Sequence, residues 1–386
     1  MLNKRNIIFV LLNFLLLTID FVPPCYCAEL SQARYIYESW DDSRGLIQKT
    51  VNTITQTPDG YLWFGNQAAL SRFDGVRFEN FMVENTPELA SSRVEALCVS
   101  KDGSLLIGTY RGGVYRMVQN RFYSLNGDNP QLRQALVYAL TESRDGTIYA
   151  GTTQGLCAIK EGAVSWFRQW ASLENSSIYA LAESSDGTLW IGTFENGMFT
   201  LKDGKLTHIL KENGNRLKDN RVQAIHISGV NTGDETVWIG SGTVLTRFKK
   251  GKFSYFPLQV LSEANNIRAL QMDSRGELWV AVDNNGIRQF NTATQKISKY
   301  TTREGLSSDS VRSFWEDREG SMWVGNSGNG IDRLRERVLA TFSIEEGMAY
   351  RYLWTVYEAR DGALWIGTAA GSYRRCSHQR KGYSPG

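Results

Sequence analysis

The chain repeats a short phrase of the form D-G-x-L-W-I-G-T about every forty residues. Clear copies are DGSLLIGT at 102–109, DGTLWIGT at 186–193 and DGALWIGT at 361–368. The fifth position of the phrase recurs in steps of 41 to 48 residues, at Trp63, Leu106, Tyr149, Trp190, Trp238, Trp279, Trp323 and Trp365. A period in the low forties with Gly-rich turns is typical of a four-stranded β-propeller blade. The sequence therefore predicts an all-β fold made of such blades.

A second phrase precedes each of the first seven copies, as in VEAL at 94–97 and VYAL at 137–140. Its third position is always small: Thr53, Ala96, Ala139, Ala180, Ala224, Ala269 or Ser313. Small side chains suit the innermost strand of a blade, because these strands converge on the propeller axis. The period of two predicts that the first and third positions share one face of this strand. The tryptophan of the second strand is expected to pack between neighbouring blades.

The blade count follows from the start of the repeat region. Residues 33–51 match residues 296–311, which read as an outer strand followed by the loop to the next inner strand. Tyr35–Glu38 is therefore expected to pair with the third strand of the last blade, near Ile331–Leu334, and to close the ring without leaving edge strands. The prediction is a seven-bladed β-propeller over 28–337, followed by an incomplete blade of a second propeller over 338–371.

The N-terminus resembles an export signal. Lys4 and Arg5 precede an apolar run that is short for a membrane span, and Pro23 and Pro24 follow it. This layout predicts a signal peptide over residues 1–27 and a periplasmic or otherwise extracytoplasmic protein; an uncleaved anchor is the alternative.

Charge and reactive residues exclude several classes of function. The net charge is +3, of which residues 1–27 contribute +1 and residues 372–386 contribute +4, so the repeats carry −2. A negative net charge argues against a nucleic-acid partner. The three histidines are scattered, and Cys98 and Cys157 are expected to be core thiols. We therefore expect no metal site, no cofactor and no catalytic residues.

The phrases QTPDGYLWFGNQAALSRFDGVRFENF (56–81) and TTREGLSSDSVRSFWEDREGSMWVGNSGNGIDRL (301–334) resemble two-component regulator propeller repeats. In that family such repeats form the periplasmic sensor portion of hybrid histidine kinases and diguanylate cyclases. The resemblance covers residues 33 to about 371. It implies two tandem seven-bladed propellers, an immunoglobulin-like domain, a transmembrane helix and a cytoplasmic output domain, and a homodimer as in related sensors.

The C-terminal segment departs from that plan. After Gly371 the expected third and fourth strands are replaced by SYRRCSHQRKGYSPG, which predicts an irregular basic tail over 372–386. A truncated or frame-shifted end and a natural short form both account for it. Kinase or cyclase activity, if relatives have it, is not expected in these residues.

A binding face is expected where the loops meet the channel mouth. The candidate ligand-binding residues are Arg93, Tyr110, Arg111, Tyr138, Tyr179, Phe194, Arg221, Arg268 and Arg312. Aromatic rings stack on sugar faces and guanidinium groups pair with carboxylate or sulfate, so these residues favour an oligosaccharide or another small molecule. Ordinary solvated loop side chains are the alternative for each residue.

Three functions stay open. The first is a ligand-sensing propeller of a two-component-type receptor. The second is a secreted propeller hydrolase or lyase, and the third is a protein-interaction scaffold.

Overall fold

The computed structural model describes residues 34–174, 176–211, 216–230, 232–258, 262, 265–337, 352–360, 364–368 and 371–375. The predicted signal peptide lies outside these residues. The described chain is β throughout, apart from the short helices η1 (Asp42–Arg44), α2 (Pro130–Gln134) and α3 (Ala171–Glu174). No helix in this part of the chain is long and apolar enough to span a membrane. Residues 35–336 form one compact unit, and a small sheet near the C-terminus belongs to another.

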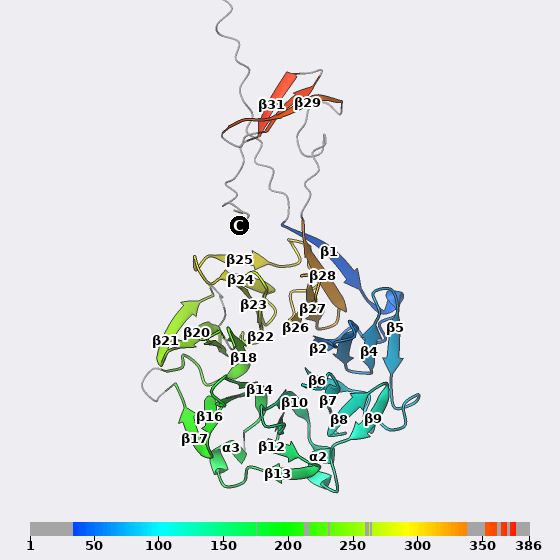
Figure 1. Cartoon of the computed structure of the whole chain (residues 1–386), viewed down its shortest axis with the longest axis vertical. Helices are drawn as coiled ribbons and strands as arrows, with labels where there is room; N and C mark the ends of the chain where they lie inside the picture. Colours follow the sequence, from blue (N-terminus) through cyan, green and yellow to red (C-terminus); the bar gives the residue numbers. More distant parts are fainter. Residues whose placement is uncertain are drawn as a thin grey trace, which may run out of the picture. The chain divides into compact units, whose positions relative to one another are not determined.

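Residues 35–336 form a ring of four-stranded antiparallel sheets, the predicted seven blades (Figure 1). From the inner to the outer strand, blade 1 contains β2 (Val51–Gln56), β3 (Leu62–Asn66), β4 (Leu70–Phe73) and β5 (Phe78–Phe81). Blade 2 contains β6 (Val94–Val99), β7 (Leu105–Thr109), β8 (Val114–Val118) and β9 (Arg121–Ser124). Blade 3 contains β10 (Val137–Glu142), β11 (Ile148–Thr152), β12 (Gly155–Lys160) and β13 (Ala163–Trp166).

The remaining blades follow the same order. Blade 4 contains β14 (Ile178–Glu183), β15 (Leu189–Thr193), β16 (Met198–Lys202) and β17 (Lys205–Ile209). Blade 5 contains β18 (Val222–Ser228), β19 (Thr236–Ser241), β20 (Val244–Lys249) and β21 (Lys252–Pro257). Blade 6 contains β22 (Ile267–Met272), β23 (Glu277–Val282), β24 (Ile287–Asn291) and β25 (Ile297–Tyr300). Blade 7 contains β26 (Val311–Glu316), β27 (Met322–Asn326), β28 (Ile331–Glu336) and, from the start of the ring, β1 (Tyr35–Trp40).

The N-terminal strand closes the ring, as the sequence predicts. β1 pairs antiparallel with β28 from Tyr35 opposite Glu336 to Trp40 opposite Ile331. Tyr35 is buried, and its ring centroid lies 5.4 Å from that of Trp279 in the preceding blade. Because β1 covers the outer edge of β28, blade 7 has the same four strands as every other blade, and β26 then packs beside β2.

Each inner strand carries a β-bulge after its first residue. The pairing register shifts between Val94 and Ala96 in β6, and a shift at the matching position occurs in the other six inner strands. A bulge adds an unpaired residue and redirects the side chains around it. The strict alternation expected from the sequence is therefore wrong here: the second and third positions of the phrase both line the channel.

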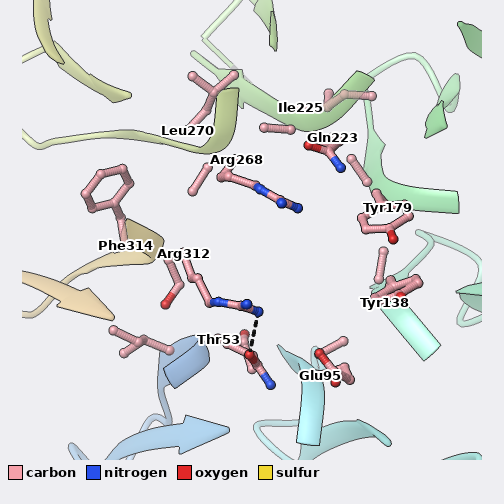
Figure 2. Close-up of a pocket in the computed structure, with 18 of the residues that line it drawn as sticks. Thr53, Glu95, Tyr138, Tyr179, Gln223, Ile225, Arg268, Leu270, Arg312 and Phe314 are labelled. Atoms are coloured by element: carbon pink, nitrogen blue, oxygen red, sulfur yellow. Dashed lines mark hydrogen bonds between the residues drawn. The ribbon is translucent and has the colours of Figure 1, made fainter. Parts of the chain in front are cut away.

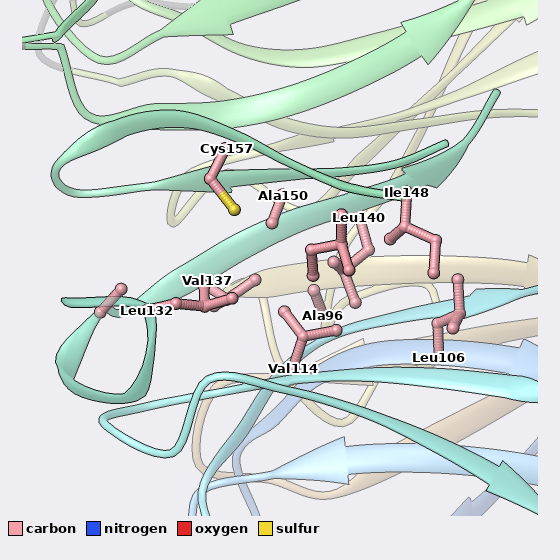
Figure 3. Close-up of a cluster of buried hydrophobic side chains, with 11 residues drawn as sticks. Ala96, Leu106, Val114, Leu132, Val137, Leu140, Ile148, Ala150 and Cys157 are labelled. Carbon is pink, nitrogen blue, oxygen red and sulfur yellow. The ribbon is translucent and has the colours of Figure 1, made fainter. Parts of the chain in front are cut away.

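The core lies between the blades rather than at the axis. Figure 3 shows the cluster between blades 2 and 3, where Leu106 and Val114 face Val137 and Cys157. Cys98 packs against this cluster, and both thiols are free, as expected for core cysteines. Burial raises the pKa of Cys98 to about 11.

The tryptophans of the second strands also pack against the next blade, which confirms their predicted role. Trp63 lies with Val94 and Leu105 of blade 2, and Trp323 lies with Phe64 of blade 1. Since each blade covers the face of its neighbour, the aromatic residues hold the ring together.

Glycine in the second strand permits this close packing. At Gly192 a Cβ atom would lie 2.6 Å from the carbonyl oxygen of Val222 in the next blade. No side chain fits in that space without moving one blade away from the other.

The C-terminal sheet has three strands, β29 (Leu353–Glu358), β30 (Leu364–Thr368) and β31 (Gly371–Arg375). β31 pairs with β30 from Gly371 opposite Thr368 to Arg375 opposite Leu364. The predicted irregular tail is therefore wrong for residues 372–375. Backbone pairing needs only N–H and C=O groups, and a polar sequence supplies them as well as an apolar one does. Residues 338–351 and 376–386 lie outside the described part of the chain.

Candidate functional site

The channel at the centre of the ring opens into a cavity of about 540 Å³. All seven inner strands contribute to its wall through the second to fourth positions of the repeated phrase. The bulge brings the long second-position side chains to the wall, while the small third position leaves room for them. The second positions are Asn52, Glu95, Tyr138, Tyr179, Gln223, Arg268 and Arg312.

Two tyrosines of this wall stack on each other. The rings of Tyr138 and Tyr179 are stacked, with centroids 4.1 Å apart and planes inclined by 19°. Burial is the main cause that raises the pKa of the Tyr138 hydroxyl above its usual range, and Tyr179 adds to it. The Tyr138 phenol therefore stays neutral at physiological pH and keeps a hydroxyl group that can donate or accept a hydrogen bond.

Two arginines approach the same space from the opposite side (Figure 2). Arg268 is paired with Asp283, whose Oδ1 accepts a hydrogen bond of 2.6 Å from Nε. Arg312 donates to the neutral side chain of Asn52 at 3.1 Å. Burial lowers the pKa of Arg312, and repulsion from Arg268 lowers it further. A bound anion would offset both effects, so this side of the cavity suits a carboxylate or sulfate group.

Gln223 carries an unpaired buried amide in the cavity wall. Its side chain is 5% exposed, and neither its amide nitrogen nor its amide oxygen has a hydrogen-bond partner among the described residues. Figure 2 shows Gln223 on the cavity wall between Arg268 and Tyr179. An unpaired buried amide costs about 1–3 kcal/mol. Both atoms are buried, so a ligand could bind them only after neighbouring side chains moved.

The predicted residues divide into two groups. Tyr138, Tyr179, Arg268 and Arg312 line the cavity. The other five do not line it, namely Arg93, Tyr110, Arg111, Phe194 and Arg221.

Residues of the second group support the wall or lie apart from it. Arg93 donates to Glu95 at 2.5 Å and lies over the ring of Tyr110, and Arg111 also lies over Tyr110. Phe194 contacts Tyr179, with ring centroids 5.5 Å apart.

Arg221 is paired instead with Asp219 at 2.6 Å. Gln223 is not among the predicted residues, although it follows Val222 as Tyr138 follows Val137 and Tyr179 follows Ile178. The second position of the phrase alone would have found it.

Acidic and metal-binding groups are sparse in the cavity. Burial raises the pKa of Glu95 against the opposing effect of Arg93. Among the described residues, no group of three or more histidine, cysteine, aspartate or glutamate side chains could hold a metal ion.

A comparison with family models finds a match to two segments of the chain. The two component regulator propeller model matches residues 45–68 and 172–195. These stretches contain the start of blade 1 and the boundary between blades 3 and 4. A search of curated proteins finds no match.

Solved structures share the fold. The extracellular domain of BT3049 from B. thetaiotaomicron, assigned as a hybrid two component system, has 24% identity and a TM-score of 0.68, over 86% of this chain and 47% of that one. The extracellular domain of BT4673 from the same organism has 19% identity and a TM-score of 0.64, over 89% and 46%. This chain therefore spans about half the length of these two structures.

Virginiamycin B lyase from Staphylococcus aureus also has this fold, with 16% identity and a TM-score of 0.59, over 78% of this chain and 99% of that one. At such identities the likeness shows a propeller fold and leaves activity open. The repeat matches are more specific: two segments of this chain, residues 45–68 and 172–195, match the two component regulator propeller model.

Proposed function

We propose that the chain is the extracytoplasmic ligand-sensing propeller of a bacterial two-component-type receptor. The proposal rests on one observation: Arg268 and Arg312 face the stacked pair Tyr138 and Tyr179 across one cavity (Figure 2). The repeat matches and the extracellular structures with the same fold support the receptor context.

The ligand that best fits this cavity is an acidic oligosaccharide. A pyranose ring would stack on an outer face of the Tyr138–Tyr179 pair, a carboxylate or sulfate would pair with Arg312, and a sugar hydroxyl group would bind the Tyr138 hydroxyl. A cavity of about 540 Å³ has room for a short saccharide. Occupancy would be passed to an output domain outside residues 35–336, and the receptor would act as a homodimer.

Calorimetric titration of the full chain with glucuronate-containing oligosaccharides tests this proposal. Arg312→Ala should weaken binding at least about tenfold, because a charge-assisted hydrogen bond contributes about 1.5–3 kcal/mol. Arg221→Ala is the matched control, since Arg221 does not line the cavity, and it should bind like the wild type. Equal losses in both variants, or no binding by the folded wild type, would contradict the assignment.

The same oligosaccharides should be released unchanged. Among the residues that the structure describes, no histidine lines the cavity, and Glu95 is paired with Arg93. Hydrolysis or elimination that disappears in Glu95→Gln would instead favour the enzyme alternative.

A further inference from the structure

A second cavity of about 530 Å³ lies between blades 4 and 5 and shares no residue with the channel. Its floor is aromatic: Trp190 of blade 4 lies 5.1 Å from Phe248 of blade 5, and Phe248 lies 4.9 Å from Phe253, measured between ring centroids. We call this cavity the blade 4–5 groove; Thr200, Thr207 and Lys250 also line it.

The corresponding groove between blades 1 and 2 is closed by three side chains. Trp63 takes the place of Trp190 there, and Arg72 stands opposite it in the next strand. Arg72 lies over the ring of Trp63, is paired with Glu79, and donates to Asn120 of blade 2 at 2.8 Å. Only about 300 Å³ remains open in that groove.

Smaller residues replace all three in the blade 4–5 groove. In the strand register, Thr200 stands where blade 1 has Arg72, and Thr207 stands where it has Glu79. Gly251 stands in the turn of blade 5 at the position that Asn120 has in the turn of blade 2. Blade 7 repeats the larger pair as Arg333 and Glu38. The blade 4–5 groove is therefore open because blades 4 and 5 lack the large side chains that fill the corresponding groove between blades 1 and 2.

The rim of the groove carries excess positive charge. Lys249 and Lys250 share a single carboxylate, that of Asp234, at 2.7 and 3.9 Å. Arg216 adds a further cation to the lining.

The two lining acids are already engaged. Asp186 is paired with Lys202 at 2.6 Å, and Glu235 accepts from the backbone N–H of Ser185 at 2.7 Å. Glu235 keeps its charge, because its donor is a neutral backbone group. With Lys202 and Asp234 included, four cations stand against three carboxylates, and the one surplus positive charge favours an anionic occupant.

We propose that the blade 4–5 groove is a second ligand site, for a pyranose unit that carries a carboxylate or a sulfate. An apolar face of the ring lies on the aromatic floor, and the anion pairs with Lys250 and Arg216. The hydroxyl groups of Thr200 and Thr207, which face each other across neighbouring strands, bind sugar hydroxyls. This inference does not depend on ligand binding in the channel.

The test follows the indole N–H resonance of Trp190 in the full chain, assigned by its loss in Trp190→Phe. The probes are a glucuronate-containing disaccharide, neutral cellobiose and phenylacetate. The acidic disaccharide should shift the resonance at the lowest concentration. No shift with the disaccharide, or a stronger response to phenylacetate, overturns the proposal.

Two sets of variants locate the binding. Thr200→Arg with Thr207→Glu introduces the pair that stands at these positions in blades 1 and 7. The ring should therefore remain folded, as thermal unfolding can verify, while the Trp190 response weakens at least about tenfold. Lys250→Glu should weaken the response to the acidic disaccharide about tenfold. Lys252→Glu, the same charge change outside the groove, should leave it unchanged. Equal responses in the filled variant and the wild type would overturn the proposal.

The outcomes also separate the two sites. Arg312→Ala should weaken binding in the channel and keep the Trp190 response, whereas the variant with the filled groove should lose the Trp190 response and keep binding in the channel. A Trp190 response that disappears in Arg312→Ala would mean that the resonance reports the channel, and the groove assignment would be wrong.

Discussion

Replacement of Tyr35 by alanine should weaken the whole ring, because Tyr35 is the first residue of the strand that closes it. Its side chain is 2% exposed, and its hydroxyl accepts a hydrogen bond of 2.7 Å from Nε2 of Gln289 in blade 6. The ring also lies edge-on to Trp279 and Tyr300. Removal of a buried aromatic side chain of this size costs about 3–5 kcal/mol.

That cost converts into a measurable change in melting temperature. An unfolding entropy of about 2.1 cal/mol/K per residue over residues 35–336 amounts to about 0.6 kcal/mol/K. Tyr35→Ala should therefore lower the Tm by roughly 5–8 °C in thermal unfolding followed by circular dichroism. Tyr35→Phe removes only the hydrogen bond of the hydroxyl and should cost about 1–2 kcal/mol.

The control is Tyr123→Ala, because Tyr123 lies on the outer strand of blade 2 and is 50% exposed. This variant should keep the Tm within about 1–2 °C of the wild type. If Tyr35→Ala and Tyr123→Ala melted at the same temperature, pairing between β1 and β28 would contribute little to stability. Closure by the N-terminal strand would then define the topology of the ring but add little to its free energy of unfolding.

Three further predictions concern acid stability, blade packing and local exchange. Burial lowers the pKa of His226 from 6.5 to about 4, so the unfolded chain takes up a proton at a higher pH than the folded chain does. The free energy of unfolding should therefore fall as the pH drops from 6.5 to about 4. In urea unfolding, the midpoint of His226→Gln should fall less over this range than that of the wild type. Gly192→Ala should destabilise the ring by about 1–3 kcal/mol in urea unfolding, and an unchanged midpoint would mean that blades 4 and 5 separate at little cost. Trp354 in β29 is 76% exposed, so amides of β29 should exchange hydrogen faster than those of β2; equal protection would contradict this.

The amino-acid sequence by itself determined the architecture of this protein. The spacing of Trp63, Leu106 and their counterparts specifies one blade per period, and no single blade can bury both of its faces alone. The match between residues 33–51 and 296–311 then assigned Tyr35 to the last blade, and the register of β1 with β28 confirms it. Local signals sufficed because a repeat fold depends mainly on contacts within a blade and with the next one.

Part of the candidate site was also within reach of the sequence. Tyr138, Tyr179, Arg268 and Arg312 occupy one position of a repeated strand, and symmetry carries that position to the channel in every blade. The bulge after the first residue of each inner strand was not predicted, since it is a feature of pairing between strands. Without knowledge of the bulge, the sequence gives no reason to predict Gln223 rather than Arg221 as the residue that lines the cavity.

Only the tertiary structure decided which spaces are filled. No sequence signal singles out Thr200, Thr207 or Gly251. They matter because strand register and ring closure place them in the blade 4–5 groove, at the positions that correspond to Arg72, Glu79 and Asn120 between blades 1 and 2. The partners of Gln223 and Arg312 likewise come from other blades or are absent from the described residues. A periodic sequence specifies where strands run, but a cavity depends on side chains that meet across blades, and their pairing is not local.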